Sequence, residues 1–212
     1  MTKTRSETDI RNPFFARLYA HLLEPLAARD GNRRRLLGDL HGRVVEVGCG
    51  AGVNFGLYPP TVAEVIAVEP EPYLRERAQR AAGSAAVAVQ VIAGQADALP
   101  LEDESVDAVV SSLVLCSVLD QATALKEMRR VLRPGGELRF YEHVAAHNTM
   151  GYALQRAADA TFWPRAFGNC HTTRETQTAI QQAGFAIEQS RRLRFPKVEP
   201  PHPHIIGVAR RS

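Results

Sequence analysis

The 212-residue sequence is short of cysteine and of long apolar runs. Its three cysteines, Cys49, Cys116 and Cys170, stand far apart and form no CxxC pair. This odd, dispersed set argues against a disulfide framework, offers no zinc-ligand spacing and predicts reduced thiols in the cytoplasm. No window approaches 18 uninterrupted apolar residues, and the first dozen residues are polar. We therefore expect neither a transmembrane segment nor a signal peptide.

Charge of one sign is not concentrated anywhere in the chain. The formal net charge is +3, and the basic residues are scattered in short groups without interleaved aromatic side chains. This distribution does not favour nucleic-acid binding. The hydrophobic content of 45% and the charged content of 23% are globular values, so we expect a single folded domain over residues 1–212.

Apolar runs alternate with helical segments along most of the chain. Five strands are predicted, at residues 43–47, 64–69, 87–93, 106–112 and 137–142. Near-continuous apolar strands separated by helices are typical of a parallel sheet covered on both faces. Two further strand-like segments, 185–193 and 204–210, predict an antiparallel finish to the sheet. Ligands of such sheets bind outside the carboxyl ends of the strands.

Several residues mark expected helix ends. Asp120 precedes a helix that the Pro-Gly-Gly run at 134–136 should end. Thr172 and Glu175 have the spacing of a capping box, and Gly184 stands where a helix from there would end. His202 and His204, isolated among prolines, are expected on the surface.

The first predicted turn carries three glycines, Gly48, Gly50 and Gly52, and Val53 stands where a dinucleotide-binding fingerprint would have its third glycine. Glycines here let the backbone approach a ligand closely. Glu69 ends the second strand, where a carboxylate can accept both ribose hydroxyls of an adenosine. The alternative for Glu69 is a solvated strand end.

Three segments extend this pattern: VVEVGCGAGVNF, GQADALPLEDESVDAVVSSLVLCSV and RRVLRPGGELRFYEH. In order and spacing they resemble class I S-adenosylmethionine (SAM)-dependent methyltransferases. The stretches GAGVNFGLYPP, LVLCSV, YEHV and NCHTTRET resemble a narrower group, the type 11 methyltransferases and the membrane-associated alkyl-thiol S-methyltransferases, without the hydrophobic N-terminal anchor of the animal proteins. The resemblance implies a Rossmann-like α/β fold with a mostly parallel seven-stranded sheet and an antiparallel C-terminal strand. It also implies a helical lid at 1–41, a SAM-binding core at 42–143 and acceptor-side elements at 144–212.

The resemblance assigns residues to SAM, whose product would be S-adenosylhomocysteine. The implied cofactor-binding residues are Tyr19, Glu46, Gly48, Cys49, Gly50, Asn54, Glu69, Pro70, Gln95, Ala96 and Leu113. Many members of the resembled family have aspartate at the position of Gln95. In this chain, Asp97 is the alternative residue for the contact assigned to Gln95. Cys49 is expected to be a small residue beside the cofactor rather than a reactive thiol.

The methyl group of a sulfonium is already activated, so its transfer needs alignment of the reacting atoms rather than an enzyme nucleophile or a metal. His143, after the fifth strand, is the candidate catalytic residue, as an assisting base or to orient the acceptor; its alternative is a structural loop histidine. The implied substrate-side residues are Cys116, Glu142, Trp163, Cys170 and His171. The alternative for each of these residues is a role in packing alone. For Cys170 and His171, a structural role at the start of the following helix is equally favoured. No metal site is predicted.

The first predicted helix begins at Asn12 and presents Phe15 and Tyr19 at helical spacing. A second short helix is expected over 33–40. We interpret the first helix as a lid over the cofactor, with a membrane-surface helix as the alternative.

The resemblance favours S-methylation of a small thiol. The alternatives are an O- or N-methyltransferase of a metabolite or lipid, and a SAM-binding regulator without catalysis. The expected protein is a cytoplasmic monomer or homodimer.

Overall fold

Seven strands form one sheet in the computed structural model, which describes residues 12–193 and 203–212. Along the sheet the order is β3-β2-β1-β4-β5-β7-β6. The strands are β1 (Gly42–Val47), β2 (Val62–Val68), β3 (Ala88–Ile92), β4 (Val106–Ser112), β5 (Leu132–His143), β6 (Phe185–Leu193) and β7 (His204–Arg211). The first five are parallel, and β7 runs antiparallel to both of its neighbours, β5 and β6. The predicted sheet is confirmed.

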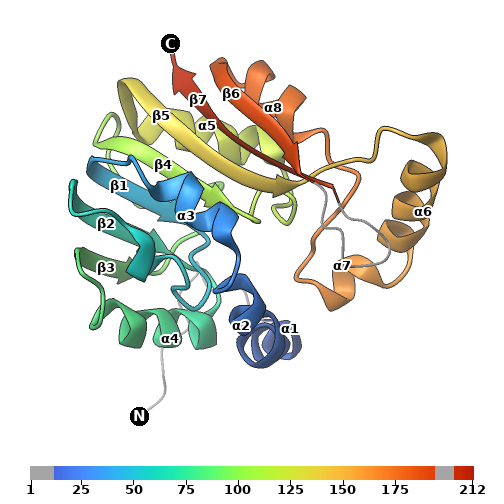
Figure 1. Ribbon diagram of the computed structural model, residues 1–212, viewed down its shortest axis with the longest axis horizontal. Helices are drawn as coiled ribbons and strands as arrows, with labels where there is room; N and C mark the ends of the chain where they lie inside the picture. The colour runs from blue at the N-terminus through green and yellow to red at the C-terminus, as the bar shows by residue number, and fades with distance from the viewer. Residues whose placement is uncertain (1–11, 194–202) are drawn as a thin grey trace.

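Short helices connect the strands and cover both faces (Figure 1). They are α1 (Pro13–Leu18), the π-helical η1 (Tyr19–Leu23), α2 (Glu24–Ala27), α3 (Gly31–Leu37), the 3₁₀ turn η2 (Phe55–Leu57), α4 (Pro72–Ala82), α5 (Gln121–Val131), α6 (Thr149–Ala160), α7 (Trp163–Ala166) and α8 (Thr176–Gln182). In the described ranges, no helix is both long and apolar enough to cross a bilayer.

The alternation of side chains along the strands divides the core into two layers. Val45 and Val47 of β1 pack on the same side as α5 and α8. Val44, which immediately precedes Val45 in the strand, packs on the opposite side with α3 and α4. The central strands β1, β2 and β4 therefore bury both faces along most of their length, which explains why their sequences are almost continuously apolar.

The carboxyl ends of the parallel strands meet at one edge of the sheet. Glu69, Leu113 and His143 follow or end β2, β4 and β5 at this edge. The helices α6 and α7 lie beyond the end of β5 (Figure 1). This arrangement positions the candidate site described below.

The predicted capping box at Thr172 is wrong. The helix α8 begins at Thr176, with Glu175 as an N-cap that makes no side-chain cap bond. Thr172 and Thr173 instead donate both their amide and hydroxyl hydrogens to the carboxylate of Asp159, at 2.7–3.0 Å. In a capping box, Glu175 would accept the hydrogen bond from the Thr172 amide. The carboxylate of Asp159, 13 residues before Thr172, accepts that bond instead.

Two other boundaries differ from expectation. The helix predicted to reach the Pro-Gly-Gly run ends at Val131, and β5 already begins at Leu132. His204, expected on the surface, is buried at 6% exposure in β7 because the strand turns it toward Tyr141 and His143. His202 lies outside the described residues.

Candidate functional site

The turn after β1 requires glycine at specific positions. Gly48 and Gly52 have φ values of 65° and 87°, in the left-handed region. A Cβ on Gly48 would lie 2.6 Å from Val114, and one on Gly52 would lie 2.6 Å from Phe55. The turn can follow this path only with glycine, which lets the backbone itself form the edge of a cavity.

Glu69 is fixed at this edge by backbone donors. Its two carboxylate oxygens accept hydrogen bonds from the Gly50 amide at 2.8 Å and the Glu71 amide at 2.9 Å. Burial raises the pKa of Glu69 to about 7 despite these two bonds. The side chain nevertheless lines the cavity, so its oxygens can also accept hydroxyl donors from a ligand.

A second buried carboxylate lies beneath the glycine turn. Glu46 accepts hydrogen bonds from the Asn54 side-chain amide at 2.7 Å and the Tyr58 hydroxyl at 2.8 Å. It is 2% exposed, and burial raises its pKa to about 7. Glu46 therefore supports the turn from below.

Arg33 of α3 joins this network from the opposite side. Its Nη1 donates to Asn54 at 3.1 Å and to Ser112 at 3.0 Å. Its Nε is buried and has no hydrogen-bond partner among the described residues. Arg33 also lines the cavity, so it places a buried positive charge with an unused donor beside the ligand space.

The cavity at the carboxyl edge has a volume of about 360 Å³. Eight of the predicted cofactor residues line it: Tyr19, Gly48, Gly50, Glu69, Pro70, Gln95, Ala96 and Leu113. Asp97, the alternative to Gln95, lines it as well. Three predicted residues, Glu46, Cys49 and Asn54, are not in the wall, because they are buried behind the turn.

The first helix contributes to the same wall. Phe15 and Tyr19 line the cavity, and burial raises the pKa of Tyr19 to about 12. On the outer face, Phe14 is 69% exposed and Leu22 is 61% exposed. The face with Phe15 and Tyr19 fits the hypothesis that the helix is a lid over the cofactor. The face with Phe14 and Leu22 provides the apolar surface that the alternative, a membrane-surface helix, requires.

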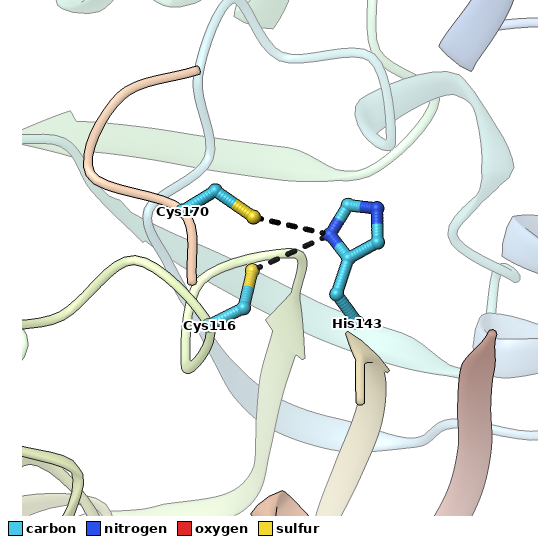
Figure 2. A group of neighbouring side chains, drawn as sticks. All are labelled: Cys116, His143 and Cys170. Carbon is cyan, nitrogen blue, oxygen red and sulfur yellow. Dashed lines mark hydrogen bonds between the residues drawn. The ribbon is translucent and has the colours of Figure 1, made fainter. Parts of the chain in front are cut away.

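The acceptor-side residues gather around His143 (Figure 2). Its Nδ1 lies 3.6 Å from Cys116 Sγ and 3.4 Å from Cys170 Sγ. The ring packs on His204, with 4.1 Å between ring centroids. Both cysteines are free and buried, at 1% and 4% exposure. The structure thus brings together three predicted residues from three separate segments.

These contacts shift the protonation of the three groups. The hydrogen bond with Cys116 lowers the pKa of Cys170 well below its ordinary value against the effect of burial, and His143 lowers it further. The same Cys170 bond and burial raise the pKa of Cys116. Burial alone would lower the pKa of His143, but its interactions with Cys170 raise it overall. Negative charge in the cluster therefore concentrates on Cys170.

Glu142 organises the loop that carries Cys116. One oxygen accepts from the Ser111 hydroxyl at 2.7 Å and the Val114 amide at 3.1 Å, and the other accepts from the Cys116 amide at 3.2 Å. Glu142 is fully buried and is not part of the cavity wall. This geometry fits a positioning residue better than direct substrate binding.

The remaining predicted residues surround Cys170. Trp163 stacks on Phe167 with 4.0 Å between ring centroids, and its side chain helps to lower the pKa of Cys170. The His171 amide donates to the Cys116 carbonyl at 2.8 Å, so this residue contributes its backbone. Neither Trp163 nor His171 lines the cavity.

Sequence reasoning missed several residues of the wall, among them Arg33, Ser117 and Asn169. Arg33 was seen only as one of a short basic group, and its place in the cavity depends on the packing of α3. Ser117 and Asn169, the chain neighbours of the two acceptor-side cysteines, also line it. Their proximity to those cysteines was the available signal.

Comparison with known proteins agrees with this geometry. Residues 45–140 match a family model described as a methyltransferase domain. The chain is 38% identical to thiol S-methyltransferase TMT1A of Homo sapiens over 171 residues, covering 78% of this chain and 69% of the relative. It is 34% identical to thiol S-methyltransferase TMT1B of Rattus norvegicus, covering 93% and 87%. The structure of a geranyl diphosphate methyltransferase in complex with SAM superposes with a TM-score of 0.68 at 17% identity, covering 95% of this chain and 92% of the other, and shows the common fold.

The fold, the glycine turn and the carboxylate after β2 define a Rossmann-like SAM-dependent methyltransferase. Within that class, the chain belongs to the methyltransferase family that includes the mammalian thiol S-methyltransferases.

Proposed function

We propose that this enzyme transfers the methyl group of SAM to the sulfur of a small thiol. The observation that carries the proposal is the 38% identity over 171 residues to a protein named for that activity. The chemistry agrees, because a thiol with a pKa near 8.5 is about a few per cent thiolate at neutral pH and is strongly nucleophilic. An aliphatic hydroxyl would need a far stronger base than a histidine.

In the proposed complex, Glu69 accepts the ribose hydroxyls and Leu113 packs on the adenosyl group. Arg33, whose buried Nε finds no partner in the part of the chain that the structure describes, pairs with the carboxylate at the methionyl end. The glycine turn, Gln95 and Ala96 complete the cofactor wall. SAM supplies an activated methyl group, so the remaining task of the protein is to align acceptor sulfur, methyl carbon and sulfonium.

His143 is the residue that we assign to the acceptor, either to orient it or to take its proton. Its support is its place at the end of β5 beside Cys116 and Cys170, whose neighbours Ser117 and Asn169 line the cavity. Trp163 and His171 belong to the acceptor side through their contacts with this cluster.

We also propose that the enzyme acts in the cytoplasm as a monomer or homodimer and does not bind nucleic acid. The dispersed basic residues and the three free cysteines support this view. Size-exclusion chromatography with light scattering tests the oligomeric state, and a larger assembly would contradict it.

The decisive experiment supplies the protein with SAM labelled in the methyl group and with a panel of small thiols, phenols and amines. We expect label in the thiols alone. Transfer only to phenols or amines would refute the sulfur assignment and support an O- or N-methyltransferase. Binding of SAM without transfer to any acceptor would instead support a regulatory protein.

A further inference from the structure

Three ligand-type side chains converge at the acceptor side of the site. Cys116 Sγ, Cys170 Sγ and His143 Nδ1 all lie within 4.8 Å of one another. Figure 2 shows both sulfur atoms directed at the same ring nitrogen. The three residues come from the loop after β4, the end of β5 and the segment before α8. No spacing pattern in the sequence brings them together, which is why no metal site was predicted.

The distances fit a tetrahedral metal centre. Zinc lies about 2.3 Å from cysteine sulfur and about 2.0–2.1 Å from histidine nitrogen. At a tetrahedral angle, these bond lengths put sulfur and nitrogen roughly 3.6 Å apart. The observed separations of Cys116 and Cys170 sulfur from His143 Nδ1 are 3.6 and 3.4 Å. An ion can therefore enter with only small movements of the side chains.

The surrounding backbone holds the ligands in place. The Cys116 amide donates to Glu142 at 3.2 Å, and the Cys116 carbonyl accepts from the His171 amide at 2.8 Å. The Asn169 side-chain amide donates to the Ser117 carbonyl at 2.8 Å. These bonds tie the two cysteine-bearing segments to each other on both sides of the cluster. Such outer support is what a preorganised metal site needs.

The donor set selects the kind of ion. Two thiolates and one imidazole are soft or borderline ligands, which suit Zn²⁺ and do not suit Mg²⁺ or Ca²⁺. Structural zinc sites have four protein ligands, whereas catalytic sites have three and leave one position for water or substrate. Among the residues that the structure describes, the cluster has three ligands, so its composition corresponds to the second kind.

We propose that Cys116, His143 and Cys170 bind Zn²⁺ and leave a fourth coordination position for the sulfur of the acceptor. The second part rests on the proposed thiol S-methyltransferase function. Ser117 and Asn169 line the cavity directly beside the two cysteines, and the acceptor reaches the ion from that wall. His143 then orients the acceptor through the metal and does not act as a base.

This arrangement accounts for deprotonation of the acceptor. The thiol binds Zn²⁺ as a thiolate and releases its proton to solvent. A thiolate lone pair forms the new sulfur–methyl bond while the methyl–sulfonium bond breaks, and that electron pair remains on the sulfur of S-adenosylhomocysteine. The thioether product carries no charge, binds zinc weakly and leaves.

The first test measures zinc by mass spectrometry of protein purified under reducing conditions with zinc present and then desalted. We expect about one zinc ion per chain, reduced at least tenfold in Cys116→Ser, Cys170→Ser and His143→Gln. Two matched controls should retain the metal: Cys49→Ser, at the buried cysteine outside the cluster, and His147→Gln, at an exposed histidine. Circular dichroism checks that each variant is folded.

The second test replaces zinc with Co²⁺, whose absorption reports its ligands. We expect the intense visible bands of tetrahedral Co²⁺ together with thiolate charge-transfer bands. A small thiol acceptor should increase the charge-transfer absorption in proportion to one additional thiolate, whereas its alcohol analogue should not. Absence of this increase would overturn the role of the fourth position.

The outcomes separate the metal site from the proposed function. Thiol methylation by protein that holds no zinc, and that a strong chelator does not inhibit, would refute the metal site alone. Zinc bound by the three residues without any thiol methylation would refute the proposed function, together with the role of the fourth position that rests on it, and would leave the metal site standing. A protein without metal whose unreduced mass is lower by two hydrogens, with the disulfide assigned to Cys116 and Cys170 by peptide mapping, would overturn the proposal.

Discussion

The carboxylate of Glu69 accepts a 2.8 Å hydrogen bond from the backbone amide of Gly50, so the end of β2 is tied to the glycine turn after β1. One residue therefore both shapes the turn and presents an acceptor to the cavity. Loss of this carboxylate should affect ligand affinity more than it affects the fold, because the strands themselves are held by their sheet partners.

Replacing Glu69 with alanine should weaken binding of S-adenosylhomocysteine by roughly 10- to 100-fold, or about 1.4–2.7 kcal/mol. The ribose hydroxyls would lose their acceptor, and the amides of Gly50 and Glu71 would lose a partner. Glu69→Gln, which keeps one oxygen, should fall between alanine and wild type. Isothermal titration calorimetry measures the change. Unaltered affinity in a folded Glu69→Ala protein would contradict the assignment to ribose.

The pH dependence of the same binding step follows from burial. Because the pKa of Glu69 is raised to about 7, lowering the pH through 7 protonates it and removes an acceptor site. Affinity for S-adenosylhomocysteine should therefore decrease below pH 7 and reach a plateau above it. In Glu69→Gln the decrease should be absent. Titrations between pH 5.5 and pH 8.5 on both proteins provide the comparison, and identical profiles would count against the prediction.

Glu46 should make stability depend on pH. Burial raises its pKa from 4.5 to about 7, so the folded protein retains a proton that the unfolded chain releases. This contribution to the free energy of unfolding is fully present below pH 4.5 and is lost as the pH rises through 7.

Glu46→Gln removes this titration and can still accept from Tyr58 or Asn54. Relative to wild type, the variant should therefore gain about 2–3 kcal/mol in unfolding free energy between pH 5 and pH 8. Urea unfolding at both pH values measures the difference. A gap between the two proteins that stays constant with pH would rule out Glu46 as the titrating group.

The hydrogen bonds that Asp159 accepts from Thr172 and Thr173 lead to a prediction about stability alone. Asp159→Ala removes the acceptor of four hydrogen bonds and should cost roughly 1.5–3 kcal/mol, the range for bonds to a charged group. Glu175→Ala should change stability by less than about 0.5 kcal/mol, because its side chain makes no cap bond. Thermal or urea unfolding of the pair decides between the observed bonds and a capping box; equal losses would favour the box.

The sequence predicted the sheet well because its signals are local. Apolar runs and turn residues placed β4 and β6 at their observed bounds, and the turn after β1 and the strand end at Glu69 identified one edge of the cavity. Thr172 shows where local patterns fail, since a tertiary partner, Asp159, replaced the expected cap.

The acceptor side depended on contacts between distant segments. His143 is 27 residues from Cys116 on one side and 27 residues from Cys170 on the other, so only the folded sheet edge could bring their polar atoms together. Arg33 was missed for the same reason, because its direction depends on how α3 packs on the sheet.

Arg33 provides the sharpest test of the methionyl end of the cavity. Its guanidinium should pair with the carboxylate of the ligand. Arg33→Met should therefore weaken the binding of S-adenosylhomocysteine by at least about 10-fold, as expected for the loss of a charged hydrogen bond. Methylthioadenosine has the nucleoside but no carboxylate, and its affinity should change little. Arg34→Met alters an exposed neighbour and should leave both affinities unchanged.

Calorimetry with the two ligands separates binding from support of the fold. Arg33 also donates to Asn54 and Ser112, so the substitution could loosen the wall that both ligands share. In that case both affinities would fall together, and Arg33 would be a structural residue of the cavity. A loss confined to the ligand with the carboxylate would place the effect of Arg33 at the methionyl end, because the nucleoside contacts are common to both.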